Sequence, residues 1–231
     1  MATRLTAERL FGDWDAARVS WDRARNQGHE HLTEIANAAM SMGHLSPGQT
    51  TPEKSRVPAY VADSTEAKCY ETLLMQHRLL FGCLDGLLAA VVAMERVAEI
   101  FATADDGGAQ QSSPQRGQRQ RSPQASPQRS PQRSPLQRSQ QRLFVTHDAA
   151  SIGGVVAEAA AMYRSQYEAC VGVVEANDPD VARASDPSIL TLRSSVWLME
   201  PMIEVRRLEV LDRIRRTELD PLSKDAFLGR R

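Results

Sequence analysis

The chain has 231 residues, of which 42% are hydrophobic and 25% are charged, and its formal net charge is −1. This length allows one domain or two small ones. The longest apolar run, residues 86–94, is far shorter than the roughly 20 residues of a membrane-spanning helix, so we expect no contact with a membrane. Residues 1–15 lack the apolar core of a signal peptide, so we expect a soluble, intracellular protein.

Residues 6–42 are predicted to form the first helix. One heptad column of this segment is interrupted at Gly28 and otherwise holds large apolar residues: Trp14, Trp21, Ile35 and Met42. Because Gly costs about 1 kcal/mol relative to Ala inside a helix, we expect Gly28 to bend or fray this one. Three prolines then predict a linker over residues 43–62.

Residues 63–103 are predicted to form a second, longer helix. Asp63 is expected to cap it, with Glu66 completing a capping box. Two heptad columns run along the whole segment: Leu73, Leu80, Leu87, Met94 and Phe101, and, offset by three, Tyr70, His77, Leu84, Val91 and Ala98. We interpret His77 as a polar register marker in this seam. So long a helix cannot bury its own seam, so other helices must cover it.

Residues 109–142 repeat Ser-Pro-Gln-Arg with little variation, and residues 109–147 hold seven Arg and no Asp, Glu or Lys. This repeat has too few aliphatic side chains for the burial of apolar area to offset the entropy lost on ordering the chain. We therefore predict a long, disordered, basic insert. Its arginines could also make weak, non-specific contacts with nucleic-acid phosphates.

Ser/Thr-Pro-x-Arg/Lys is the pattern that cyclin-dependent kinases prefer. Four predicted phosphorylation sites match it: Thr51, Ser113, Ser126 and Ser130. A phosphate on each would add nearly two negative charges and could cancel the basic charge of the insert. The alternative is a repeat expanded by drift, in which the consensus is incidental.

A third helix is predicted over residues 148–176, capped by Thr146 or Asp148 and stopped at Asn177-Asp178-Pro179. A fourth is predicted over residues 187–217, with Asp186 as its cap and Pro187 at its first position. Pro201 removes a backbone donor, so we expect a kink or break at Glu200. Residues 219–231 are expected to be a frayed tail.

These elements predict an all-α protein, an elongated antiparallel bundle of four to five helices with coiled-coil-like seams. Residues 1–108 would form an N-terminal helical hairpin and residues 143–218 a C-terminal helical pair. No segment of useful length alternates with period two, so a sheet is not expected.

The sequence contains no motif of a catalytic, cofactor or metal site, so we expect no enzyme and no cofactor. Cys69, Cys83 and Cys170 have no metal-type spacing and are interpreted as reduced, buried or half-buried thiols. His29 and His31, two residues apart, would lie on different faces of a helix, so we interpret them as solvent-exposed polar residues.

Trp14, Trp21 and Trp197 are interpreted as core anchors where helices cross. The alternative is a partner interface, in which Trp is frequent.

Each of the four predicted helices carries short motifs in a characteristic order. The first has Asp13-Trp14, Trp21 and Ile35-Ala36-Asn37, and the second has Cys69-Tyr70, Leu84-Asp85-Gly86-Leu87 and Met94-Glu95. The third has Met162-Tyr163-Arg164, with Asp178-Pro179-Asp180 after it, and the fourth has Trp197-Leu198, Pro201 and Arg207-Leu208-Glu209. In this order and spacing the chain resembles the cyclin-dependent kinase 2-interacting protein family, over about residues 13–218 apart from the two linkers. The Ser-Pro-Gln-Arg insert is longer and more repetitive than that family leads us to expect, so no family function extends to it.

The resemblance implies a non-enzymatic adaptor in the nucleus, with a further pool in the cytoplasm. Its implied partners are cyclin-dependent and replication-initiating kinases, subunits of an AAA+ ATPase complex, and a related helical subunit. The implied settings are cell-cycle and DNA-damage checkpoint signalling in DNA replication, replisome turnover, and ribosome biogenesis through maturation of the large subunit.

The resemblance also singles out Leu84-Asp85-Gly86-Leu87 as the centre of the second helix and Met162, Tyr163, Arg164 and Pro201 as core or interface residues. Because a mid-helix Gly is locally unfavourable, we predict a close helix crossing at Gly86. Two alternatives to an adaptor remain: a nucleic-acid-associated protein that binds through the basic insert, and a plain coiled-coil tether.

Overall fold

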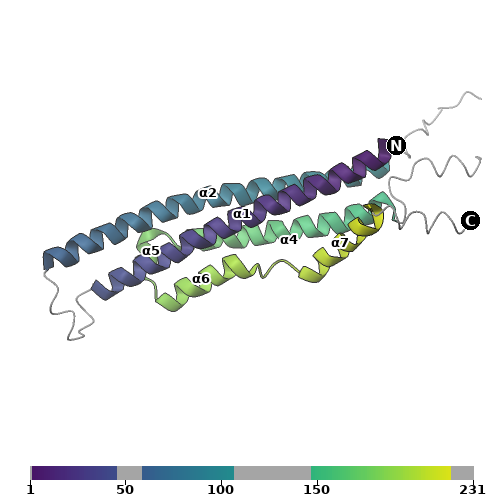
Figure 1. The fold of residues 1–231 in the computed structure, drawn as a ribbon. Helices are drawn as coiled ribbons and strands as arrows, with labels where there is room; N and C mark the ends of the chain where they lie inside the picture. Colours follow the sequence, from purple (N-terminus) through teal and green to yellow (C-terminus); the bar gives the residue numbers. More distant parts are fainter. Residues whose placement is uncertain (1, 46–58, 107–146, 220–231) are drawn as a thin grey trace, which may run out of the picture.

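The computed structural model describes residues 2–45, 59–106 and 147–219 (Figure 1). The predicted insert, most of the first linker, nearly all of the predicted tail and all four predicted phosphorylation sites lie outside the described residues. Every regular element in the described ranges is an α-helix, which confirms the predicted all-α bundle. The helices are α1 (Ala2–Leu45), α2 (Ala59–Asp106), α4 (Ala149–Ala176), α5 (Pro179–Ala184), α6 (Pro187–Met199) and α7 (Val205–Leu219).

The long helices run alternately up and down a narrow rod (Figure 1). The antiparallel order of α1 and α2 follows from the ring contact of Phe11 with Phe101 at one end and the hydrogen bond of His31 to Gln76 towards the other. Neighbouring pairs repeat the pattern: α4 meets α2 through Glu95–Arg164 and His77–Val174, and α7 meets α1 through Arg18–Asp212 and Asp15–Arg215.

One hydrophobic cluster runs the length of the rod and receives side chains from all six helices. Leu73, Leu80, Leu87, Met94 and Phe101, the first predicted column of α2, are all almost fully buried within it. The N-terminal hairpin and the C-terminal helices therefore share one core. Within the described residues, no helix is both long enough and apolar enough to span a bilayer.

Two predicted helix caps are confirmed. The Asp148 side chain accepts a hydrogen bond from the backbone N–H of Ser151 at 2.6 Å, and Asp186 accepts one from Ser188 at 2.8 Å. Both caps have extended backbone angles, as N-cap residues do. The bond from Ser151 also lowers the pKa of Asp148.

The predicted cap at Asp63 is wrong, because α2 begins about one turn earlier, at Ala59. Ala59 and Ala62 favour helix, so nothing in this stretch halts it before Asp63 is reached. Glu66, predicted to complete the capping box, instead forms an ion pair with Arg183 of α5. The helix α5 was itself not predicted. Its signal is Asp178-Pro179, the same cap-and-proline pair that begins α6 at Asp186-Pro187.

Candidate partner-binding surface

All three tryptophans lie in the core. Trp14 and Trp21 of α1 both pack edge-on against the Tyr163 ring of α4, with ring centroids 6.2 and 5.0 Å away. Trp197 of α6 is fully buried. The structure thus places these residues at helix crossings, where large rings stabilise packing through the area that they bury.

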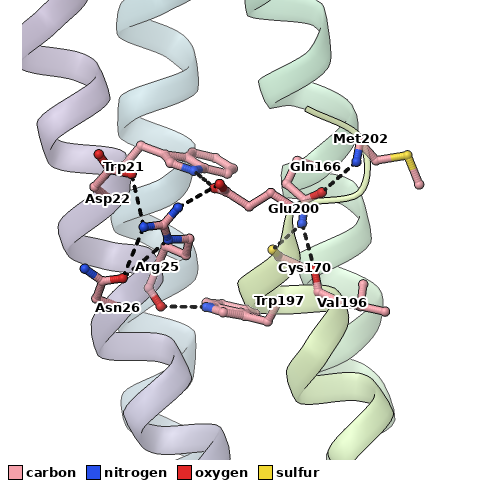
Figure 2. Close-up of polar contacts among 10 residues, drawn as sticks. All are labelled: Trp21, Asp22, Arg25, Asn26, Gln166, Cys170, Val196, Trp197, Glu200 and Met202. Carbon is pink, nitrogen blue, oxygen red and sulfur yellow. Dashed lines mark hydrogen bonds and ion pairs between the residues drawn. The ribbon is translucent and has the colours of Figure 1, made fainter. Parts of the chain in front are cut away.

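The chain breaks between α6 and α7 at Glu200, where the sequence predicted a kink or break. Glu200 has φ 49° and ψ 56°, a left-handed conformation that costs about 1–3 kcal/mol for a residue other than Gly. Its carboxylate accepts hydrogen bonds from the Trp21 indole at 2.5 Å and from Arg25 at 2.7 Å (Figure 2). These two donors on α1 hold the strained turn in place. Pro201 itself is exposed beside the break.

Gln166 of α4 holds the same break from the other side (Figure 2). Its fully buried side chain donates to the carbonyl of Val196 at 3.2 Å and accepts from the backbone N–H of Met202 at 3.2 Å. One amide thus satisfies a carbonyl in the last turn of α6 and a backbone donor beyond it. Nothing in the helical periodicity distinguishes Gln166 from a surface glutamine, so it was not predicted.

Gly28 lets α6 approach α1 closely. A Cβ atom on Gly28 would lie 2.1 Å from Cζ2 and 2.5 Å from Cε2 of the Trp197 indole. The indole N–H donates to the carbonyl oxygen of Arg25 at 2.8 Å, which fixes the ring over this position. The predicted fraying at Gly28 is wrong, because α1 is continuous through this position, where the glycine makes room for an aromatic ring.

The contacts of Glu200, Gln166 and Trp197 hold the inner face of α6 against the bundle, whereas the outer face of α6 is exposed. Ile189, Leu192 and Met199, spaced to share one helical face, are 44, 65 and 76% exposed. Beyond the break, Met202 and Val205 are 47 and 65% exposed. We call these five residues the α6–α7 apolar surface.

The composition of α6 explains this exposure. Only Arg193 among its 13 residues is charged, and only Leu190 and Trp197 are buried. Four more of its residues are Ser or Thr, so α6 is not apolar on all sides, but a cluster of exposed apolar residues still marks an interaction site. The two methionines of the α6–α7 apolar surface, Met199 and Met202, have flexible side chains that can adapt to an irregular apolar partner.

The predicted centre of α2, Leu84-Asp85-Gly86-Leu87, has some residues in the core and others on the surface. Leu84 and Leu87 are buried and Asp85 is exposed. A Cβ atom on Gly86 would lie 3.1 Å from that of Ala24 on α1, so the predicted close crossing exists and lies within the chain. The structure therefore gives Gly86 an intramolecular contact.

The predicted motif on α4 serves the bundle itself. Tyr163 is buried between tryptophans, and Arg164 donates two hydrogen bonds to Glu95 of α2, at 2.9 and 2.6 Å. Met162 is partly buried against the core, and its sulfur accepts from the backbone of Glu204 at 3.4 Å. None of these three residues belongs to the α6–α7 apolar surface.

The histidine pair lies on different helix faces, as predicted, but the prediction that it is solvent-exposed is wrong. Both rings are half-buried: His29 contacts the Ser194 hydroxyl of α6 at 3.1 Å, and His31 contacts Gln76 of α2 at 2.7 Å. His77, predicted as a register marker, contacts the Val174 carbonyl at 3.2 Å. These imidazoles therefore link neighbouring helices.

Burial shifts the ionisation of several core groups. It raises the pKa of Tyr163 to about 12, although the nearby Arg18 opposes the shift. It likewise raises the pKa of the Cys170 thiol to about 12 and raises that of Cys83. The three cysteines are free, two of them buried and Cys69 half-buried, as predicted. The raised pKa values keep the Cys83 and Cys170 thiols protonated and unreactive.

The described ranges contain no group of three or more His, Cys, Asp or Glu side chains that could hold a metal ion. No protein-family model matches the chain, and no curated protein is significantly similar to it. The candidate site is therefore supported by its geometry alone. It is an apolar face of α6, and polar contacts inside the bundle hold this helix against the rod.

Proposed function

We propose that this chain is a non-catalytic helical adaptor that binds a helical partner subunit through the α6–α7 apolar surface. The observation that carries the proposal is the exposure of that surface on a rigidly held element. Because Glu200, Gln166 and Trp197 already fix the position of α6, little ordering entropy is lost when a partner binds. The uncharged surface suits the apolar stripe of an amphipathic helix.

The resemblance to the cyclin-dependent kinase 2-interacting protein family supports a setting for this adaptor. We propose that it acts in the nucleus as a subunit of an AAA+ ATPase assembly, with a related helical subunit as the direct partner. Its proposed roles are in replisome turnover, large ribosomal subunit maturation, and contact with cell-cycle and replication-initiating kinases. The ATPase would supply energy, and the adaptor would supply contact surface.

Affinity purification of the full chain from its native cells, followed by mass spectrometry, tests the proposal. We expect AAA+ ATPase subunits among the recovered proteins. The double variant Leu192→Glu/Met199→Glu should lose them, because two carboxylates in a buried apolar interface would cost several kcal/mol. Both residues are exposed, so the variant should keep the circular dichroism and melting temperature of the unmodified chain.

Val19→Glu is the matched control, since Val19 is 59% exposed on α1 and lies outside the α6–α7 apolar surface. It should recover the same partners as the unmodified chain. Recovery of unchanged partners by the double variant would exclude the α6–α7 apolar surface as the binding site. Recovery of neither AAA+ ATPases nor kinases by the unmodified chain would exclude the proposed setting.

The seven arginines of residues 109–147 favour a second candidate, contact with nucleic-acid phosphates. Such contact should weaken steeply with salt and disappear when residues 109–142 are deleted. An adaptor that binds through α6 should retain its protein partners after that deletion.

A further inference from the structure

The outer side of the α1–α2 hairpin carries a second uncovered apolar face. A groove of about 630 Å³ runs between the two helices, lined largely by small side chains such as Ala16, Ala89 and Ala93. Three charged residues also line it: Arg96 of α2, and Arg9 and Asp13 of α1, which form an ion pair with each other. Figure 1 draws α2 along one edge of the rod and α6 and α7 along the opposite edge. This face is therefore separate from the α6–α7 apolar surface.

The exposed side of α2 has a heptad-like pattern of its own. Phe81 and Val92 are about half exposed (49 and 51%), Ile100 is exposed at 39%, and Leu88 is half-buried. Positions 81, 85, 88, 92, 96 and 100 recur at intervals of three and four, so they lie along one side of the helix. This second seam points away from the buried one, and within the described residues only α1 and α2 line the groove beside it.

Two charged residues interrupt the seam, Asp85 and Arg96, and both are exposed. Neither forms an ion pair with another side chain in the described part of the chain. They are too far apart along one helix to pair with each other, since only residues three or four apart meet on a helix surface.

We propose that two copies of this chain associate through this face, with their α2 helices packed antiparallel about a two-fold axis level with the Ala90–Val91 peptide. Residues equally distant from the axis then face one another: Asp85 meets Arg96 of the second copy, Phe81 meets Ile100, Leu88 meets Ala93, and Val92 meets Ala89.

The self-complementarity of this register is the reason for choosing a second copy as the occupant. A two-fold interface uses one patch twice, so each acidic group must find a basic one at the symmetric position. Here the two charges form two equivalent ion pairs, and on either side of the axis a large aliphatic residue faces an alanine. Pairing a large side chain with a small one suits the interdigitation of side chains between packed helices.

Light scattering coupled to size-exclusion chromatography of the purified full chain tests the proposal. We expect twice the chain mass, falling towards the chain mass on dilution. Asp85→Arg alone and Arg96→Asp alone should each weaken the dimer at least about tenfold, because each substitution places like charges together at both ion pairs. The charge swap Asp85→Arg/Arg96→Asp should restore association to near its original strength.

Glu34→Arg reverses an exposed charge of α1 that does not line this groove and should leave the dimer unchanged. A monomer at every concentration would overturn the proposal. So would a dimer that the single reversals leave intact, or one that the charge swap fails to restore. Because Leu192 and Met199 lie on the opposite edge, Leu192→Glu/Met199→Glu should still dimerise, so failure of the proposed adaptor surface can be told apart from failure of this one.

Discussion

Glu200 is the residue on which the position of α6 depends. Its left-handed backbone is unfavourable by itself, and its carboxylate is the common acceptor for Trp21 and Arg25 of α1. A buried or half-buried carboxylate that loses one donor retains its desolvation penalty without the compensating bond. The contacts of this one side chain therefore connect the end of α6 to the middle of α1.

Two tryptophans of α1 allow this contribution to be measured. Trp21 donates its indole N–H to Glu200, whereas the indole nitrogen of Trp14 has no hydrogen-bond partner in the described part of the chain. Both substitutions to Phe remove similar ring area, so Trp21→Phe should cost about 1–3 kcal/mol more than Trp14→Phe in urea unfolding. Equal losses would show that the bond to Glu200 contributes nothing to stability.

Tyr163 should make the fold sensitive to alkaline pH. Its folded-state pKa of about 12 lies above the ordinary value of 10, so the native state holds the phenolic proton more tightly than the unfolded chain. This difference adds about 3 kcal/mol to the free energy of unfolding. The contribution is present in full below pH 10 and is lost as pH rises towards 12. Tyr163→Phe should flatten this loss in urea unfolding between pH 9 and pH 12, whereas an unchanged slope would contradict it.

At the scale of the elements, close approach of α6 to α1 requires a glycine at position 28. Gly28→Ala should destabilise the protein by about 1–3 kcal/mol, because its Cβ would overlap the Trp197 indole, although Ala favours helix. Gly12→Ala is the matched control in the same helix, since nothing lies within 4 Å of a Cβ there, and it should stabilise by about 0.5–1 kcal/mol. Chemical denaturation measures both, and a stabilising Gly28→Ala would refute the close approach.

Local sequence patterns predicted the helices and their ends better than the long-range contacts that hold the helices together. The heptads of α2, the caps at Asp148 and Asp186 and the break at Glu200 follow from spacing and backbone chemistry, which are local in the chain. The contacts that fix α6 are not local: Gln166 and Glu200 are ordinary polar residues until the fold brings Met202 and Trp21 to them. Tertiary packing likewise decides that Gly28 accommodates a ring rather than fraying a helix.

The candidate site was missed for a related reason. The residues that the resemblance singles out include Trp14, Trp21 and Tyr163, and the structure buries all three. The spacing of Ile189, Leu192 and Met199 by itself predicts a core face, and this prediction is wrong because the structure exposes all three, most of all Met199. Only the arrangement of α4 and α6 shows that this residue points outwards.

At the scale of the whole molecule, the described residues form a rod with one core and two apolar faces, on opposite edges, that no other described helix covers. In the proposed register the face on α2 is complementary to itself in charge, whereas the α6–α7 apolar surface is uncharged and is proposed to bind a different chain. A dimer formed through α2 would therefore present two α6–α7 apolar surfaces, one on each outer edge. This arrangement would let one adaptor dimer contact two copies of a partner subunit.

Methionine oxidation of the chain alone and in its purified native complex tests the adaptor surface most directly. In the free chain, Met199, Met202 and the exposed Met40 of α1 should react with peroxide, whereas the buried Met94 should not. In the complex we expect several-fold slower oxidation of Met199 and Met202 and an unchanged rate at Met40, measured by peptide mass spectrometry. Equal oxidation of Met199 and Met202 in the free and bound chain would contradict partner binding through the α6–α7 apolar surface.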